Sequence, residues 1–257
     1  MILVLGGTKD GRMLAEVLSG HGYRIRVSVF SEYGRELVKM DEDLVHTGAL
    51  DADGFSSFIC ENQIDLLVDA SHPYAVNVSK NAMLACQATG IPYLRYERPR
   101  ANLPDYKGLH VVPSYTEAAE TAAMLGKVIF LTTGSRHLGI FREAASQQHH
   151  RLIARVLPEP EVLEECFRLG FKPRDIVAMQ GPFSHSLNVA LFQEFHADVI
   201  VTKNSGQIGG SDAKITAAMS LGLPLVVIER PSIQYHNVVY TIEDVINFIK
   251  GVPKCSI

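Results

Sequence analysis

Cysteine is scarce and scattered in this chain of 257 residues. The four cysteines are Cys60, Cys86, Cys166 and Cys255, and no two of them lie within four residues of each other. This spacing excludes a zinc knuckle and a Cys-x-x-Cys redox pair, and we expect no metal site. Scattered cysteines are typical of buried apolar side chains in a reducing compartment. The N-terminal segment also lacks the features of a signal peptide, so we expect a cytoplasmic protein.

The chain has no excess of positive charge and no long apolar run. Its formal net charge is −4 and its pI is about 6.2, which argues against a general basic surface for nucleic acid or for an anionic membrane. No apolar run approaches the roughly 18 residues of a membrane-spanning helix. We therefore expect neither nucleic acid nor a membrane as a partner, while the oligomeric state is open. An anionic ligand would have to be bound by local groups of Lys and Arg.

Several catalytic signatures are missing as well. There is no Gly-x-Ser-x-Gly elbow, which argues against a serine hydrolase of that type. None of the nine tyrosines is followed by Lys at the spacing Tyr-x-x-x-Lys, which excludes the short-chain type of nicotinamide enzyme. Any catalytic function must therefore be inferred from other motifs of the sequence.

The chain does contain an internal repeat. Residues 64–71 resemble residues 197–204, and 90–99 resemble 222–231; both of the latter segments end in Glu-Arg-Pro. Asp65 and Asp198, one in each copy, are 133 positions apart. The match extends upstream, where Ile2-Leu3-Val4-Leu5 before Gly6-Gly7-Thr8 resembles Val128-Ile129-Phe130-Leu131 before Thr132-Thr133-Gly134.

The apolar segments of each copy are short and continuous, as in strands of a parallel sheet that is buried on both faces. Gly-Ile-Pro and Gly-Leu-Pro are typical helix ends that lead into a strand. The sequence thus predicts an α/β fold of two Rossmann-like, doubly wound domains, at 1–100 and 105–257, joined by a polar linker at 100–108. The expected helices include 12–18, 78–88, 116–125, 186–195 and 214–221.

Ligands of doubly wound sheets bind outside the carboxyl ends of the strands. We expect the two domains to face a shared cleft with these ends. The alternative is that the repeat records a duplicated fold without a common site. The C-terminal piece, 240–257, could pack on either domain.

The first loop, Gly6-Gly7-Thr8 with Arg12 after it, follows a strand and opens a helix. Glycines allow a phosphate close to the backbone, and N–H groups at a helix start attract anions. The loop matches neither Gly-x-Gly-x-x-Gly nor the phosphate loop of NTPases, so a plain tight turn is the alternative.

The end of the second strand should distinguish NADH from NADPH. Glu32 lies about where an acid would accept a bond from the ribose hydroxyl of NADH, whereas Ser31 and Arg35 could hold the additional phosphate of NADPH. An exposed loop acid without a ligand is the simpler interpretation of Glu32.

A Ser-His-Pro-Tyr segment, Ser71 to Tyr74, follows the third buried strand of the first copy. His72 could donate a proton or a hydrogen bond near neutral pH. Alternatively, Ser71 caps the next helix and His72 packs locally.

The second copy has polar residues at corresponding strand ends: Thr133, Ser135, Arg136, His137, Ser184, Lys203, Ser205 and Gly206. Arg and Lys side chains bind carboxylates or phosphates well. Arg136, His137 and Lys203 could each also be a solvated surface residue. Arg98 and Arg230, in the two Glu-Arg-Pro segments, could form structural ion pairs or contact a ligand.

Taken in order, these segments resemble the precorrin-6A reductases of cobalamin biosynthesis. The matching segments are 5–8 with 10–12, 69–75, 90–92 with 97–99, 133–136, 181–184, 202–206 and 229–231. Each is short, but the ordered set is specific.

The resemblance implies two Rossmann-like domains that could exchange a strand. It also implies reduction of one double bond of a tetrapyrrole polycarboxylate, precorrin-6A or cobalt-precorrin-6A, to the 6B form by NADPH or NADH. On this basis Gly6, Gly7, Thr8, Arg12, Ser31, Glu32 and Ser71 would bind the cofactor. Thr133, Ser135, Arg136, Ser184, Lys203, Ser205 and Gly206 would bind the macrocycle, and His72 or Tyr74 would supply a proton. A two-lobed binding protein and a nucleotide-sugar type of transferase are the alternatives.

Overall fold

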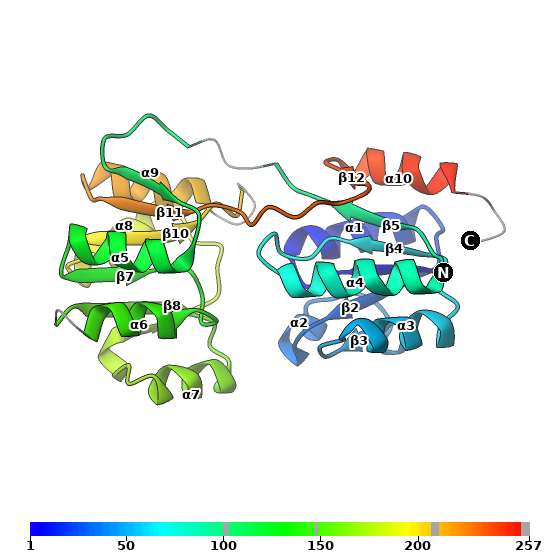
Figure 1. The fold of residues 1–257 in the computed structure, drawn as a ribbon, viewed down its shortest axis with the longest axis horizontal. Coiled ribbons are helices and arrows are strands. Elements are labelled where there is room, and N and C mark those ends of the chain that lie inside the picture. The colour runs from blue at the N-terminus through cyan, green and yellow to red at the C-terminus, as the bar shows by residue number, and fades with distance from the viewer. Residues whose placement is uncertain (100–102, 147–148, 207–210, 253–257) are drawn as a thin grey trace. The chain divides into compact units, whose positions relative to one another are not determined.

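The computed structural model describes residues 1–99, 103–146, 149–206 and 211–252. Its strands form two six-stranded sheets (Figure 1). The chain divides into two units: unit 1 comprises Met1–Pro99 together with the segment from Pro231 onward, and unit 2 comprises Arg100–Arg230.

The sheet of unit 1 has the strand order β12-β5-β4-β1-β2-β3, and every neighbouring pair is parallel. This is the 3-2-1-4-5-6 order of the Rossmann fold, with β12 in the sixth place. The strands are β1 Ile2–Leu5, β2 Ile25–Val29, β3 Val45–Thr47, β4 Leu66–Asp69, β5 Tyr93–Tyr96 and β12 Val238–Val239. The helices are α1 Lys9–Gly20, α2 Glu32–Glu36, α3 Ala52–Glu61, α4 Val76–Thr89 and α10 Ile242–Gly251, with a short 3₁₀ turn at Glu42–Leu44.

Unit 2 repeats this architecture with the order β6-β11-β10-β7-β8-β9, again all parallel. Its strands are β6 Leu109–Val112, β7 Val128–Leu131, β8 Arg151–Val156, β9 Ile176–Ala178, β10 Val199–Lys203 and β11 Leu225–Ile228. Its helices are α5 Tyr115–Leu125, α6 Leu138–Ser146, α7 Pro160–Arg168, α8 His185–Glu194 and α9 Ser211–Ser220, with a 3₁₀ turn at Pro173–Asp175. The predicted fold class and helices are confirmed.

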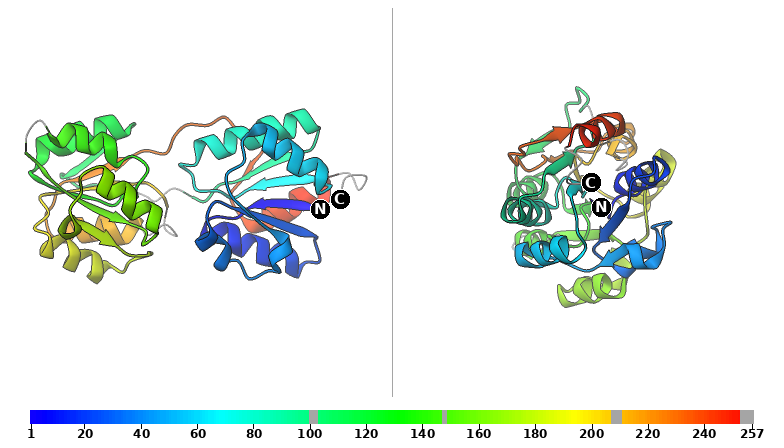
Figure 2. Two further views of the ribbon diagram at one scale, coloured as in Figure 1. Left: turned by 90° about the horizontal axis from the view of Figure 1, so that it is seen from below. Right: turned by 90° about the vertical axis from the view of Figure 1, so that its right-hand side faces the viewer.

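Helices cover both faces of each sheet, as Figure 2 shows for the separate units. In unit 1, Leu14 and Leu18 of α1 and Val245 and Ile249 of α10 pack on one face. Helices α3 and α4 cover the other face, for example through Phe55. Burial on two faces explains why the strands are continuously apolar rather than alternating.

The units exchange their sixth strands. β6 directly follows the first repeat in the chain but pairs with β11 of unit 2, and β12 follows the second repeat but pairs with β5 of unit 1. The expected C-terminal domain, 105–257, is therefore corrected: the chain from Pro231 onward belongs to unit 1. The physical reason is that the apolar side of α10 completes the core over β1 and β4. The expected cleft shared by the two domains stays a prediction.

Strand register also corrects the first part of the repeat by one position. Ile2 pairs with Leu66 in unit 1, and Ile129 pairs with Val199 in unit 2. Gly7 and Thr8 are thus equivalent to Gly134 and Ser135, instead of to Thr133 and Gly134. The helix ends are as predicted: Gly90 and Gly222 have φ of 75° and 67°, a left-handed conformation that glycine adopts without strain.

Candidate functional site

In unit 1, two loops meet at the point where the direction of the chain across the sheet reverses. β1 and β4 are neighbours, and from them the chain continues outward to β2 on one side and β5 on the other. Such a point leaves a crevice at the carboxyl ends of the two strands. The loop 6–8 after β1 and the loop 70–75 after β4 lie there.

Thr8 connects these two loops. Its hydroxyl oxygen accepts a hydrogen bond from the N–H of Gly11 at 3.0 Å and so caps α1. The same hydroxyl donates to the carbonyl of Ala70 at 3.1 Å. The helix therefore begins at Lys9, and Arg12 lies half-buried within its first turn instead of in the loop. The predicted role of Thr8 next to a helix start has a geometric basis.

The glycines around Thr8 serve two different purposes. A Cβ on Gly6 would lie 2.5 Å from Cγ1 of Val27, and one on Gly11 would lie 2.8 Å from the Cα of Gly6. Both positions are needed for close packing of strand and helix. Gly7 is exposed, and a Cβ there would meet nothing within 4 Å. The backbone at Gly7 is therefore open in front of the positive end of α1, an arrangement that fits a diphosphate.

A buried ion pair supports the first turn of α1. Nη1 of Arg98 lies 2.9 Å from Oδ2 of Asp10, and both side chains are buried. Arg98 follows β5, so this pair connects α1 to a third strand end. For Arg98, the structural ion pair predicted as one alternative is thus present.

At the end of β2, Ser31 and Glu32 belong to the short helix α2. The Ser31 hydroxyl oxygen accepts a bond from the N–H of Gly34 at 3.2 Å and caps this helix. The exposed carboxylate of Glu32 lies 3.4 Å from Nη1 of Arg35, whose Nη2 lies 3.0 Å from Glu42. The three residues predicted to distinguish the two cofactors are therefore neighbours in the structure.

The loop after β4 is held by Asp69, which the sequence analysis did not single out. Asp69 is fully buried and accepts hydrogen bonds from Ser79 and Tyr93 at 2.6 Å and from Nη1 of Arg95 at 2.8 Å. Burial acts to raise the pKa of Asp69, but Arg95 and the hydrogen bonds from Ser71, Ser79 and Tyr93 outweigh it and leave the pKa below its ordinary value. A polar residue at the end of an apolar strand was the available signal.

Ser71 is part of this network. Its N–H donates to Asp69 at 2.9 Å, and Arg95 donates to its hydroxyl at 3.1 Å and to its carbonyl at 3.0 Å. Ser71 does not cap α4, because the cap position is Ala75. The Arg95 guanidinium also pairs with Glu97 at 2.7 Å, so it joins β4, β5 and the Ser71 loop.

His72 and Tyr74 lie next to each other on this loop. The Tyr74 N–H donates to Nδ1 of His72 at 3.2 Å, and the two ring centroids are 5.6 Å apart. Since Nδ1 is an acceptor here, a neutral His72 ring carries its proton on Nε2. Both side chains are half-buried.

Unit 2 has an equivalent reversal point between β7 and β10. After β7, Thr133 is buried and Ser135 half-buried, while Arg136 is exposed. His137 packs against the ring of Tyr115, with centroids 3.8 Å apart. Burial lowers the pKa of His137, and the charges of Lys203 and Arg136 lower it further.

Lys203, the last residue of β10, is close enough to Arg136 for the two charges to interact. Burial, followed by repulsion from Arg136, lowers the pKa of Lys203 to about 8. Ser205 is buried, and Gly206 has a φ of 82°. The structure thus places the charges of Arg136 and Lys203 near each other. The remainder of the loop, 207–210, lies outside the described residues.

Ser184 has a local structural role. Its hydroxyl oxygen accepts from the N–H of Leu187 at 3.2 Å and caps α8, and the side chain is exposed. Arg230, the second Glu-Arg-Pro arginine, is buried and donates from Nε to the carbonyl of Asn204 at 2.8 Å. It therefore supports the loop after β10.

Two further cations of unit 2 were not predicted. Arg155 on β8 and Lys214 in the first turn of α9 are both buried. Burial lowers the pKa of Arg155 to about 10. Burial, then repulsion from Arg155 and Lys203, lowers that of Lys214 to about 7. A single Arg within the apolar run of β8 was the available signal for the first.

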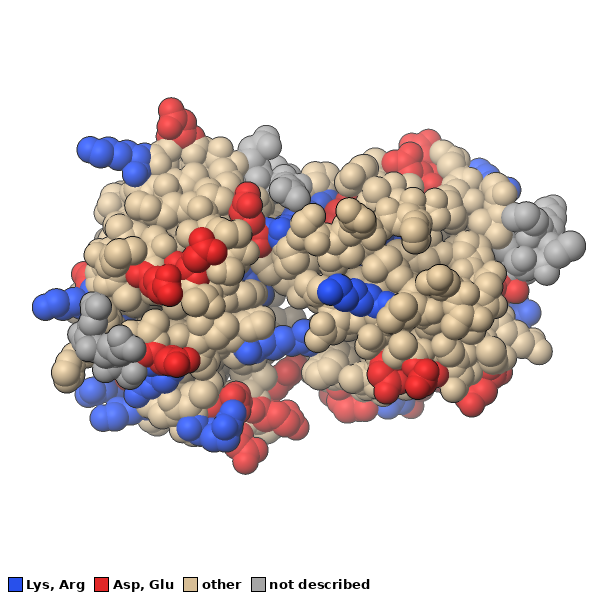
Figure 3. All heavy atoms as spheres, in the orientation of Figure 1, with Lys and Arg blue, Asp and Glu red and all other residues tan. Residues whose placement is uncertain are grey.

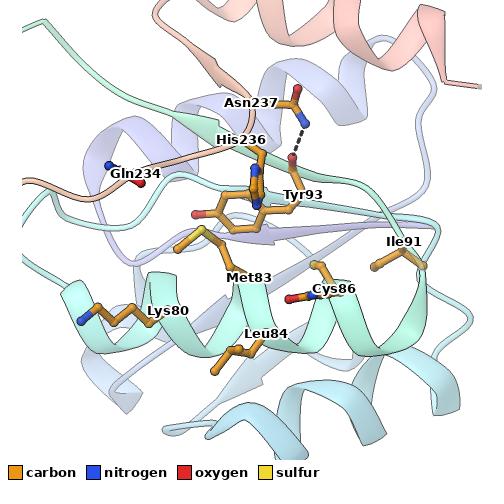
Figure 4. Close-up of a pocket in the computed structure, with 10 residues that line it drawn as sticks. Lys80, Met83, Leu84, Cys86, Ile91, Tyr93, Gln234, His236 and Asn237 are labelled. Carbon is orange, nitrogen blue, oxygen red and sulfur yellow. Dashed lines mark hydrogen bonds between the residues drawn. The ribbon is translucent and has the colours of Figure 1, made fainter.

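A cavity of about 580 Å³ lies elsewhere on unit 1, between α4 and the segment 234–237 (Figure 4). Met83, Cys86 and Tyr93 line it, and the amide of Asn237 donates to the carbonyl of Tyr93 at 3.2 Å. Ile91 and Tyr93 mark the amino end of β5, away from the loops after β1 and β4. No residue of the predicted sites lines this cavity.

Neither the charged surface nor the arrangement of metal-ligating side chains indicates a further site in the part of the chain that the structure describes. On the face drawn in Figure 3, acidic and basic side chains are interspersed on each unit. Within the described ranges, no group of three or more His, Cys, Asp or Glu side chains could hold a metal ion. In the same part of the chain, no helix has the length and apolarity to cross a membrane.

The comparisons with known proteins agree with this geometry. The family model "Precorrin-6x reductase CbiJ/CobK" matches residues 1–250. The chain belongs to the precorrin-6x reductase family. This family is one of oxidoreductases in cobalamin biosynthesis.

Individual members of the precorrin-6x reductase family match along almost the whole chain. The cobalt-precorrin-6A reductase of Priestia megaterium is 40% identical over 248 residues, covering 96% of this chain and 97% of the relative. The precorrin-6A reductase of Rhodobacter capsulatus is 31% identical over 251 residues, covering 96% and 95%. The solved structure of CobK precorrin-6A reductase superimposes with a TM-score of 0.77 at 26% identity, covering 97% of this chain and 95% of the other.

Proposed function

We propose that this chain reduces one macrocycle double bond of precorrin-6A, or of its cobalt form, with a hydride from NADPH or NADH, and so makes the 6B form. The observation that carries the proposal is the open backbone at Gly7 in front of the capped start of α1, within a reductase family. The relatives bear the names of both the cobalt-containing and the metal-free reductases, so both substrates belong in the test. Family membership also weighs against a binding protein and against a transferase.

The cofactor would be held by unit 1. Gly6 and Gly7 let the diphosphate approach the N–H groups at the start of α1, and Thr8 keeps that helix start beside the loop after β4. Arg12, in the first turn of α1, lies near enough in sequence to add positive charge. Ser71 is held in position by Asp69 and Arg95, so its loop offers a preformed wall for the nicotinamide.

Ser31, Glu32 and Arg35 would decide between the two cofactors. A ribose hydroxyl of NADH would donate to Glu32, whereas the phosphate of NADPH would draw Arg35 away from Glu32 and Glu42. Glu32→Gln should therefore weaken NADH binding selectively, and Arg35→Ala should weaken NADPH binding selectively.

The macrocycle would be bound by unit 2. Arg136 and Lys203 supply positive charge for its carboxylates, and Thr133, Ser135, Ser184, Ser205 and Gly206 supply polar groups at the same edge of the sheet. The cofactor supplies the hydride. A proton must be added to the neighbouring carbon, and His72 through Nε2 or Tyr74 through its hydroxyl would donate it.

The reaction would take place in the cytoplasm. Cys60, Cys86 and Cys166 are free thiols, which suits a reducing compartment. Cys255 lies outside the described residues. The partners of the protein are then a tetrapyrrole polycarboxylate and a nicotinamide cofactor.

The test is a cofactor-oxidation assay with enzymatically made precorrin-6A, with and without cobalt. Each substrate is mixed with the protein and NADPH or NADH separately, and cofactor absorbance is followed. We expect cofactor loss in proportion to the macrocycle, and none without it. Arg136→Ala should raise KM for the macrocycle and leave cofactor binding unchanged. Tight binding of both ligands without cofactor oxidation in any combination would overturn the proposal.

A further inference from the structure

Two buried positive side chains underlie the carboxyl edge of the unit 2 sheet. Arg155 is 6% exposed and Lys214 is 9% exposed. Arg155 follows Ala154, which pairs with Leu131 of β7, while Thr202 follows Val201, which pairs with the same Leu131. Arg155 and Thr202 thus lie in one row across the sheet. Ile153 and Ile200, two residues earlier on each strand, both belong to the core beneath α8 and α9, so the row points to that side.

The contacts that the structure describes for these groups include no counter-ion. Nη1 of Arg155 donates to the Asn188 side-chain oxygen at 2.8 Å, and the guanidinium stacks on Phe183 at 4.2 Å from the ring centroid. Among the described residues, neither Arg155 nor Lys214 forms an ion pair with a carboxylate. The hydroxyl of Thr202 is fully buried and has no hydrogen-bond partner within the same residues. Burying a charge without compensation costs free energy, so the two buried cations Arg155 and Lys214 indicate an anionic ligand.

The internal repeat allows this edge of unit 2 to be compared with the corresponding edge of unit 1. Thr202 of β10 is the equivalent of Asp69 of β4, 133 positions earlier. In unit 1, Asp69 neutralises the buried Arg95 at 2.8 Å. Unit 2 replaces both partners of this pair, because Thr202 stands in place of Asp69 and its register neighbour Val227 stands in place of Arg95. The buried cations of unit 2 come instead from β8 and α9, and the residue in place of Asp69 offers them a hydroxyl but no carboxylate.

The position suits an anion for a second reason. Lys214 belongs to the first turn of α9, whose N-terminal N–H groups carry a partial positive charge. α8, which carries Asn188, also begins at this edge with Ser184 as its cap. Two cationic side chains, a hydroxyl and a helix start thus come from β8, β10 and α9.

We propose that Arg155, Lys214 and the hydroxyl of Thr202 form a subsite for one carboxylate arm of the macrocycle. This assignment rests on the proposed function. It differs from the exposed Arg136 in depth: a carboxylate bound here loses its water and neutralises the buried cations Arg155 and Lys214. The subsite would therefore fix the register of the macrocycle, while Arg136 contributes attraction at the surface.

The test uses uroporphyrin III, a stable octacarboxylate macrocycle, as the probe and measures its fluorescence on titration with the full-length protein. Lys214→Met removes the charge and keeps the length of the side chain. We expect a roughly ten- to hundredfold weaker Kd, the loss of one hydrogen bond to a charged group. Lys214→Arg should remain within a few-fold of the native protein. Lys127→Met, at an exposed position just before β7, is the matched control and should bind normally.

Thermal unfolding of the ligand-free variants separates a binding role from a structural one. Because no carboxylate of the described residues pairs with the buried Lys214, Lys214→Met should keep or raise the Tm. A lower Tm with unchanged probe binding would overturn the subsite, as would equal Kd values for Lys214→Met and the native protein. Loss of NADPH binding but not of NADH binding would assign the cations to the cofactor phosphate and also overturn it.

The outcome is independent of the reductase assay. If the native protein binds uroporphyrin III through Lys214 but oxidises no cofactor with precorrin-6A, then the proposed function fails and the carboxylate subsite stands. If it reduces precorrin-6A and the variant Lys214→Met has the native KM, then the subsite fails alone.

Discussion

At the scale of single residues, the site of unit 1 depends on one buried carboxylate. Asp69 accepts hydrogen bonds from four residues and neutralises Arg95, which in turn holds the Ser71 loop. Breaking such a pair by removing one partner leaves a buried charge uncompensated. Asp69 therefore contributes both to the stability of unit 1 and to the position of the loop that contains Ser71.

We predict that Asp69→Asn lowers the free energy of unfolding by about 3–5 kcal/mol. Asp65→Asn, at the other end of β4, removes a partly exposed ion pair with the N-terminus and should cost less than about 1 kcal/mol. Urea unfolding of both variants measures the difference. Similar values for the two would contradict a central role of Asp69.

The pH dependence of stability follows from the same residue. The pKa of Asp69 is lower in the folded protein than its ordinary value of about 4, so the unfolded chain binds a proton first. The stabilisation is present above that ordinary value and is lost as the pH falls through the folded pKa. We expect unfolding experiments to show this acid loss in the native protein and a flatter profile for Asp69→Asn.

Thr8 provides a second prediction at this scale. Thr8→Val removes the cap of α1 and the bond to Ala70, whereas Ser114→Ala removes a side-chain cap of the same kind from α5 in unit 2. Each should cost about 1 kcal/mol of stability. Only Thr8→Val should also weaken NAD(P)H binding, measured by calorimetric titration, and Thr8→Ser should restore it. Equal cofactor affinity in both variants would refute the role of Thr8.

At the scale of elements, the strand–loop–helix segment 2–20 combines tight packing with a loop that is accessible to a ligand. Gly11 permits α1 to approach the end of β1, Gly6 leaves room for Val27 of β2, and Gly7 leaves the backbone accessible. Packing and binding can therefore be separated by substituting neighbouring glycines.

We predict that Gly11→Ala destabilises the fold, because its Cβ would lie 2.8 Å from backbone Cα of Gly6 and 3.1 Å from the carbonyl oxygen of Leu5. Gly7→Ala should leave the Tm unchanged or slightly raised and still weaken cofactor binding. Gly20→Ala, at the open far end of α1, is the control and should alter neither. If Gly7→Ala binds cofactor normally, the diphosphate does not lie there.

At the scale of the whole molecule, the exchange of sixth strands makes unit 1 discontinuous in sequence, whereas unit 2 is one continuous segment. Unit 1 is completed only by β12 and α10, whose Val245 and Ile249 are buried in its core. Val238 pairs with Arg95 to form the sheet edge.

We therefore predict that residues 1–99 alone do not fold stably, whereas 1–99 joined through a flexible linker to 231–257 do. Loss of the α10 contacts exposes a core face that includes Leu94 and Val68. Circular dichroism and cooperative urea unfolding distinguish the two chains. Equal stability of the shorter chain would show that β12 and α10 are dispensable.

Local patterns were sufficient for much of this protein. Continuous apolar strands, glycine at helix ends and the two Glu-Arg-Pro segments predicted the parallel sheets, the duplication and the loops around Gly7 and Lys203. These features depend on neighbours in the chain, which a sequence displays directly. The ordered motifs also indicated the reductase family.

The tertiary structure decided which segment completes which sheet and which side chains neutralise each other. The pairing of β12 with β5 joins residues more than 140 positions apart, and no local pattern marks it. Asp69, Arg155 and Lys214 were missed because their importance comes from burial and from the presence or absence of an opposite charge nearby. Burial and charge compensation are properties of packed neighbours in space, and they exist only once the chain has folded.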